Sequence, residues 1–252
     1  MFIHCKLAIL ILVLSLDSQV HTGKIIGGHE AVPHSRPYMV LVKQHTTDGK
    51  PKYCGGFLLN EDFVMSAAHC QAKHIFVYIG AHRSPIENIQ PIPVDQTFPH
   101  KAFNATSYKN DIMLLKLSSK AHFNKNVRPI ALGDHSGLPK ACIVSGWGRD
   151  NTSEFMSVVL KEVNVTLIDD IRCSMENNYC SKGETGPAEG DYGGPLVCED
   201  GKAYGVVSNS LKPHSGAPPI HFYSKISHYK SWVTSTIRNA WKSSKYVTLD
   251  LD

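Results

Sequence analysis

The sequence predicts an all-β protein with one helix near its end. Short segments rich in β-branched and aromatic residues recur along the chain, and turn residues separate them. This spacing is typical of sandwiches or barrels rather than of βαβ units. With 42% hydrophobic and 19% charged residues, the composition is that of an ordinary globular protein, and 252 residues suffice for one large β domain or two small ones.

Nine segments are the clearest strand candidates, and a late apolar stripe predicts the helix. In order, the segments are 38–44, 54–59, 63–67, 74–80, 111–117, 141–147, 158–168, 195–198 and 203–208. The polar stretch 118–140 is suited to connect two β halves. Helical spacing places five apolar residues on one face, which favours docking on a core over binding a partner. They are Tyr229, Trp232, Val233, Ile237 and Trp241.

The first residues indicate secretion. Lys6 precedes an unbroken apolar run over residues 7–16, which is too short for a membrane span of about 20 residues. A charged start before such a run is typical of a signal peptide, here residues 1–22 with an uncertain end. A buried N-terminal helix is the alternative. No later stretch is apolar enough to predict a membrane span.

The cysteines and sequons fit an extracellular or secretory-granule protein. Removal of the signal takes Cys5 and leaves six cysteines, enough for three disulfides among fifteen possible pairings. Zinc binding is a weak alternative because no CxxC occurs. Glycosylation sequons begin at Asn104, Asn151 and Asn164.

The net charge of +4 is mild, and no basic run reaches five residues. We therefore expect a solvated surface rather than a nucleic-acid-binding one.

Three short motifs carry residues suited to catalysis. SAAHC (66–70) places His69 at the end of an apolar strand, and NDIMLL (110–115) places Asp111 just before another. GDYGGP (190–195) is a tight turn that runs into an apolar strand. Such a turn usually presents a small nucleophile at its third position, but here that residue is Tyr192. Each motif alone also has an ordinary structural interpretation.

Taken together, the motifs resemble the trypsin-like (chymotrypsin-fold) serine proteases. IIGGHE at residue 25, CGGFLL, SGWG (145–148) and the GVVS strand also match, and HSRPYM (34–39) is most similar to the granzyme and mast-cell chymase branch. The resemblance implies two antiparallel six-stranded β-barrels with a C-terminal helix and a cleft between the barrels. The protease domain would span 25–240, with the barrels linked through 118–140, and a tail would follow over 241–252.

The resemblance also assigns roles to the motif residues. His69 would be the general base, and Asp111 would orient its imidazole. The backbone N–H groups of Gly190 and Tyr192 would form the oxyanion hole. The implied disulfides are Cys54–Cys70, Cys142–Cys198 and Cys173–Cys180, the last closing an unusually short loop.

An activation step is implied at the mature N-terminus. Residues 23–24 would form a propeptide, and cleavage after Lys24 would free Ile25. The new ammonium group would then be buried against Asp191. Because a buried carboxylate without a cation is costly, this step would act as a switch.

Tyr192 departs from the family, which carries the nucleophilic serine at this position. A phenol oxygen lies roughly 6 Å from Cα, whereas attack requires reacting atoms about 3–3.5 Å apart. Loss of a triad nucleophile costs on the order of 10⁶ in turnover in subtilisin. We therefore expect a pseudoprotease that acts by binding protein or peptide ligands, for example protease inhibitors, or glycans.

The alternative is an active serine endopeptidase of non-tryptic specificity, if the organism makes another residue at position 192. Gly186 stands where trypsin-like members carry an acid, and Ser208, Asn209 and Ser210 would line the pocket wall. His221 aligns ambiguously, and a surface or packing role is favoured over a role in binding substrate. The chain would be a monomer, and no ligand cluster implies a metal or an organic cofactor.

Overall fold

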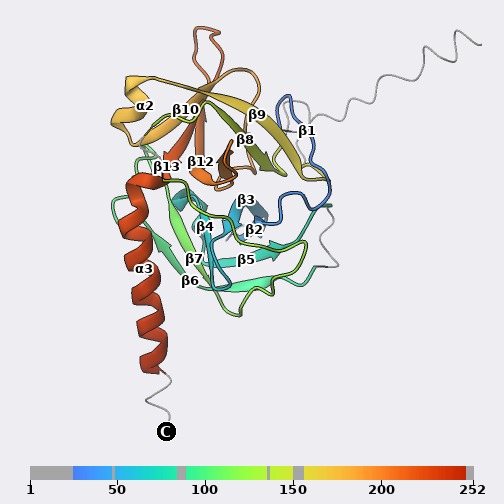
Figure 1. Cartoon of the computed structure of the whole chain (residues 1–252), viewed down its shortest axis with the longest axis vertical. Helices are drawn as coiled ribbons and strands as arrows, with labels where there is room; N and C mark the ends of the chain where they lie inside the picture. Colours follow the sequence, from blue (N-terminus) through green and yellow to red (C-terminus); the bar gives the residue numbers. More distant parts are fainter. Residues whose placement is uncertain (1–24, 47–48, 84–88, 135–136, 150–155, 248–252) are drawn as a thin grey trace, which may run out of the picture.

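The chain forms two β-barrels side by side, with a long C-terminal helix that runs along the edge of the first barrel (Figure 1). This computed structural model describes residues 25–46, 49–83, 89–134, 137–149 and 156–247. The predicted signal peptide and propeptide therefore lie outside the described residues. No helix within these ranges is long and apolar enough to cross a membrane.

The first barrel closes in the order β2-β3-β4-β7-β6-β5, with every neighbouring pair antiparallel. Its strands contribute large side chains such as Phe57, Phe63 and Met65 to the hydrophobic core, each with no exposed surface. The strands are β2 (Met39–His45), β3 (Pro51–Leu58), β4 (Phe63–Ser66), β5 (His74–Ile79), β6 (Ile92–Pro99) and β7 (Met113–Leu117).

The second barrel is built from the chain after residue 140. Its sheet has seven strands in the order β1-β9-β10-β13-β12-β11-β8, and a further pairing of β9 with β8 closes all of them except β1 into a ring. The two six-stranded antiparallel barrels predicted from the sequence are thereby confirmed. The strands are β1 (His29–Glu30), β8 (Ala141–Gly146), β9 (Lys161–Ile168), β10 (Asn178–Lys182), β11 (Pro195–Cys198), β12 (Ala203–Leu211) and β13 (Ile220–Lys225).

The predicted late helix is α3 (Ile226–Val247). Tyr229 and Val233 of its apolar stripe are buried, and Trp232 and Ile237 pack partly buried against the core. Trp241 is 46% exposed and packs edge-on against Phe63 of β4. The helix extends into the segment 241–252 that we expected to be a tail, because no glycine or proline interrupts it.

Three disulfides pair the cysteines as the resemblance implied. They are Cys54–Cys70, Cys142–Cys198 and Cys173–Cys180. The last joins the short helix α2 (Ile171–Met175) to β10.

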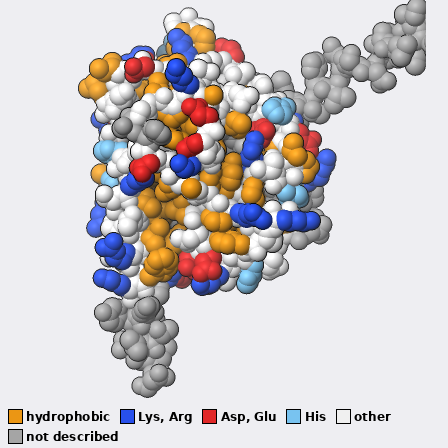
Figure 2. Space-filling view, in the orientation of Figure 1, with side chains coloured by type: hydrophobic (Ala, Val, Ile, Leu, Met, Phe, Trp, Pro, Cys, Tyr) orange, Lys and Arg blue, Asp and Glu red, His pale blue; other side chains and the backbone are white. Residues whose placement is uncertain are grey.

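Acidic and basic side chains are scattered around a band of hydrophobic side chains on the face shown in Figure 2, without a large patch of one charge sign. This distribution fits the expected solvated surface.

Candidate active site

His69 and Asp111 meet at the edge of the first barrel. His69 lies in a single 3₁₀ turn (η1, Ala68–Cys70) after β4, and Asp111 lies two residues before β7. The His69 ring nitrogen Nδ1 is 2.7 Å from Asp111 Oδ2, and the backbone N–H of His69 donates to Asp111 Oδ1 at 2.9 Å. Because an ionised carboxylate only accepts, Nδ1 carries the proton. Nε2 lies 3.7 Å from Sγ of Cys70, whose sulfur is in the Cys54–Cys70 disulfide.

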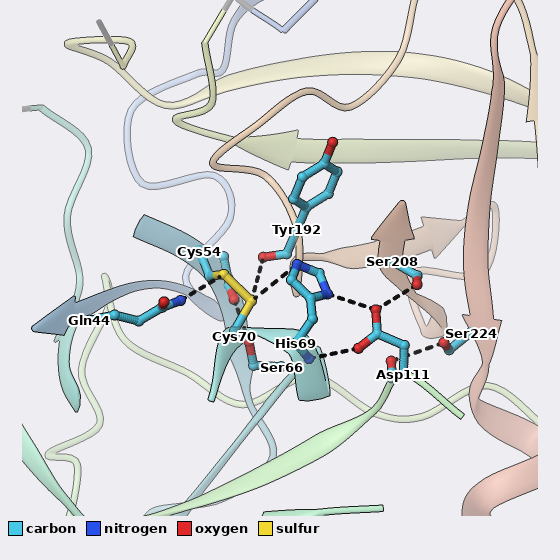
Figure 3. Close-up of polar contacts among 10 residues, drawn as sticks. Gln44, Cys54, Ser66, His69, Cys70, Asp111, Tyr192, Ser208 and Ser224 are labelled. Atoms are coloured by element: carbon cyan, nitrogen blue, oxygen red, sulfur yellow. Dashed lines mark hydrogen bonds and ion pairs between the residues drawn. A yellow bond between two sulfur atoms is a disulfide. The ribbon is translucent and has the colours of Figure 1, made fainter. Parts of the chain in front are cut away.

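Asp111 is also held by the second barrel (Figure 3). Its carboxylate has no exposed surface, and Ser208 of β12 donates to Oδ2 at 2.6 Å. Ser224 of β13 donates to the backbone carbonyl of Asp111 at 3.0 Å. Several donors thus satisfy a buried charge, as such a group requires.

Tyr192 lies beside this pair but does not complete it. Its ring meets the His69 ring edge-on, with centroids 5.4 Å apart, and the ring of Tyr108 does the same at 5.5 Å. In Figure 3 the phenol hydroxyl points away from His69 and Asp111. Burial raises the pKa of Tyr192, so the phenol stays protonated at neutral pH.

The turn that carries Tyr192 is fixed to both barrels. The Tyr192 carbonyl accepts from the N–H of Gly55 in β3 at 2.7 Å, and the Gly193 N–H donates to Val207 of β12 at 2.7 Å. Gly193 has a φ of +89°, and a Cβ there would lie 2.3 Å from the Gly55 oxygen. The sequence therefore needs glycine directly after position 192.

The expected oxyanion-hole donors line the cleft. Gly190 adopts a φ of +100°, and it borders the cleft together with Tyr192. Within the described residues, neither backbone N–H donates a hydrogen bond to the protein. Backbone N–H groups that have no partner among the described residues are free to bind an oxyanion or a carboxylate.

Ile25 and Asp191, the pair implied for activation, are both fully buried. Ile25 has no exposed surface, and the next residue, Ile26, bridges Gly186. Asp191 accepts from the N–H groups of Gly148 at 2.7 Å and Ala188 at 2.9 Å. Its full burial nevertheless raises its pKa to about 7.

The cleft has a volume of about 1020 Å³ and runs across the barrel junction. Ser208, Asn209 and Ser210 line it as predicted, whereas Gly186 is not among the lining residues. Sequence analysis did not identify Tyr108, Arg149 or Glu189, which also line the cleft. Arg149 and Glu189 form a partly exposed ion pair at 3.5 Å.

His221 is buried, with 1% of its surface exposed, so of the surface and packing roles favoured from the sequence the structure supports packing. Its ring contacts Ser210 and lies against Gly186.

One group of potential metal ligands lies near the site. Among the described residues, Cys54, His69 and Cys70 bring three ligand atoms within 4.8 Å of one another. Both cysteines are joined in a disulfide and supply no thiolate, so the group does not fit a metal centre.

Two of the predicted glycosylation sites, Asn104 and Asn164, are exposed. Asn151 lies outside the described residues.

Comparison with known proteins places this geometry in a family. The family model "Trypsin" matches residues 25–233. Granzyme B(G,H) of Mus musculus is 40% identical over 252 residues, covering 93% of this chain and all of the relative. Granzyme H of Homo sapiens is 40% identical, covering 91% of this chain and 98% of the relative.

A solved structure titled "Structure of GrC" superposes with a TM-score of 0.73 at 35% identity, covering 85% of this chain and all of that one. The chain therefore belongs to the trypsin family of serine proteases and their homologues, in its granzyme branch.

Proposed function

We propose that this granzyme-like protein has no peptidase activity and acts by binding protein or peptide ligands in its cleft. One observation carries the proposal. Tyr192 stands where the family presents serine, and its hydroxyl points away from His69 in Figure 3. A nucleophile must lie within hydrogen-bond reach of its base and about 3–3.5 Å from the attacked carbon. The phenol meets neither requirement, and its ring takes up room beside His69.

The other residues of the site support a loss of peptidase activity through residue 192 alone rather than through general decay of the site. Asp111 has contacts with His69 and Ser208, and Gly190 and Tyr192 border the cleft. These groups suit a bound peptide whose carbonyl or carboxylate oxygen accepts from the two N–H groups. Protease inhibitors present such a segment, and glycans are a second class of ligand to test.

The test is labelling by a fluorophosphonate probe, which reacts with activated serines. The chain cleaved after Lys24 is compared with its Tyr192→Ser variant and with Tyr192→Ser/His69→Ala as the matched control. We expect labelling of Tyr192→Ser alone. Labelling of the natural chain would show a working nucleophile and overturn the proposal. Absence of labelling in all three would contradict a defect confined to residue 192.

We further propose that the chain is secreted or stored in granules as a glycosylated monomer after removal of residues 1–22. The apolar run after Lys6 and the exposure of Asn104 and Asn164 support this. Mass spectrometry of protein from the culture medium tests it. An N-terminus at Met1, or no glycan on any sequon, would contradict the corresponding part.

A further inference from the structure

The disulfide between Cys54 and Cys70 lies beside the ring of His69 (Figure 3). Its two sulfurs and a ring nitrogen of His69 all lie within 4.8 Å of one another. His69 Nε2 is 3.7 Å from Cys70 Sγ, and among the described residues this is the only hydrogen-bonding contact of Nε2. The nitrogen that would serve a serine protease as its base therefore has a sulfur atom as its neighbour.

The other sulfur also has a polar neighbour, and its residue borders the cleft. Gln44 of β2 donates from Nε2 to Cys54 Sγ at 3.1 Å. Gln44 and Cys54 line the cleft, whereas Cys70 does not line it and has no exposed surface. A small molecule that enters the cleft can therefore reach Cys54 but not Cys70.

The other two disulfides lack such neighbours. Among the residues that the structure describes, no hydrogen bond reaches any of their sulfur atoms. Cys142 and Cys198 are 2% and 6% exposed, and Cys54 is 4% exposed. Since burial is so similar, Cys142–Cys198 is an internal reference. A faster reaction at Cys54 would come from the cleft and from the polar neighbours of its disulfide.

Thiol–disulfide exchange depends on the sulfur that leaves as well as on the thiol that attacks. The sulfur leaves faster when its negative charge is stabilised, and a protonated imidazole next to a cysteine stabilises the thiolate. Asp111 lies 2.7 Å from His69 Nδ1 and would stabilise that protonated ring. His69 is therefore placed to assist Cys70 as the leaving group.

We propose that Cys54–Cys70 is a redox-active disulfide, which small thiols cleave in the folded protein with His69 as the acid. A thiolate in the cleft attacks Cys54 Sγ and forms a mixed disulfide with it. The Cys54–Cys70 bond breaks, its electron pair moves to Cys70 Sγ, and protonated Nε2 of His69 donates its proton to that sulfur. A second thiolate then attacks the mixed disulfide and releases Cys54 as a thiolate. The two small thiols supply the two electrons and leave as their own disulfide, and His69 takes up a new proton from solvent.

The reduced form has an acceptor for the new thiol. The Tyr192 carbonyl oxygen lies 3.8 Å from Cys70 Sγ and can accept from its S–H group. Reduction would also remove the covalent link between β3 and the turn η1 that carries His69. The reaction needs no nucleophile at position 192, so the inference does not depend on the proposed function.

The test is timed exposure of the secreted, folded chain to 2-mercaptoethanol, followed by acid quenching and mass spectrometry of mixed disulfides and alkylated cysteines. The natural chain is compared with His69→Ala and with His214→Ala, which replaces an exposed histidine that does not line the cleft. We expect Cys54–Cys70 to react roughly tenfold faster than Cys142–Cys198 in the natural chain. His69→Ala should lose this advantage and His214→Ala should keep it. The first adduct should form on Cys54.

A slower reaction of His69→Ala could not come from poorer access, because removing a ring that lines the cleft enlarges it. If His69→Ala does not fold, His69→Gln is used instead, since an amide fills the space but is no acid. Three results would overturn the proposal. They are equal rates for Cys54–Cys70 and Cys142–Cys198 in the natural chain, an undiminished rate without His69, and a first adduct on Cys70.

Discussion

At the scale of single residues, Asp191 explains the glycines of the SGWG motif. A Cβ at Gly146 would lie 2.0 Å from an Asp191 carboxylate oxygen, and one at Gly148 would lie 2.4 Å away. The motif thus leaves room for a buried carboxyl group that has two backbone donors and, among the described residues, no ion pair. Burial outweighs those donors and raises the pKa of Asp191 to about 7.

This pKa predicts how the uncleaved chain responds to pH. The folded value of about 7 lies above the unfolded value of about 3.9. The folded state therefore binds more protons between these values, and stability falls as pH rises through that window. From pH 5 to pH 7, we expect the unfolding free energy of the natural chain to fall about 2 kcal/mol more than that of Asp191→Asn. Urea unfolding at both pH values measures this, and identical pH dependence of the two chains would contradict it.

At the scale of elements, sequence analysis identified the strands with clear apolar patterns. All nine predicted segments contain a strand, but β1, β6, β10 and β13 were not predicted. β6 (IPVDQTFP) has three consecutive polar residues at its centre and two prolines, and it forms because β5 and β7 pair with it on both sides. Such pairing overrides local propensity and is not visible in a short polar segment.

Sequence analysis of the candidate site had the same limit, because contacts between distant segments are not visible in a short stretch of sequence. His69 and Asp111 were identified because their short motifs, taken together, resemble those of the trypsin-like serine proteases. Tyr108 was not identified, and His221 was named only as an ambiguous position, because the contacts of both residues are made across the fold. The Tyr108 ring meets His69, which is 39 residues earlier in the chain, and His221 pairs with Ser210 through β13, a strand that was not predicted. The positions of motif residues can be identified from a short stretch of sequence, but the shape of a pocket depends on the whole fold.

The burial pattern of α3 predicts that substitutions at two neighbouring residues affect stability differently. Val233 is buried against the core and Thr234 is exposed. Val233→Ala should destabilise the protein by about 2 kcal/mol, because it removes buried methyl groups and leaves a cavity. Thr234→Ala should change stability by less than about 0.5 kcal/mol. The midpoints of urea unfolding curves, with unchanged slopes, measure the two changes in stability. Equal effects of the two substitutions would show that α3 does not pack through its apolar stripe.

At the scale of the whole molecule, the docking of the two barrels assembles the site. The first barrel supplies His69 and Asp111, and the second supplies Tyr192 together with Ser208, which holds Asp111. The tight turn around Tyr192 is bonded to Gly55 across the junction. Ile25 belongs to the hydrophobic core of the second barrel, and Tyr192 packs partly buried against the same cluster. Through this cluster, the residue that we predict to be the mature N-terminus is coupled to Tyr192, which lines the cleft.

This coupling predicts a conditional effect of cleavage after Lys24. The freed ammonium of Ile25 would supply the cation that Asp191 lacks among the described residues, and it would lower the pKa of that carboxyl. The fall in unfolding free energy that we expect between pH 5 and pH 7 in the uncleaved chain would then disappear. We expect cleavage to raise the thermal midpoint by about 5 °C at pH 7 and by less at pH 5. Asp191→Asn should show no such pH-dependent gain, and Lys24→Gln treated with the same protease controls for cleavage elsewhere. An equal gain at both pH values, or one that survives Asp191→Asn, would mean that cleavage acts through packing of Ile25 rather than through its charge.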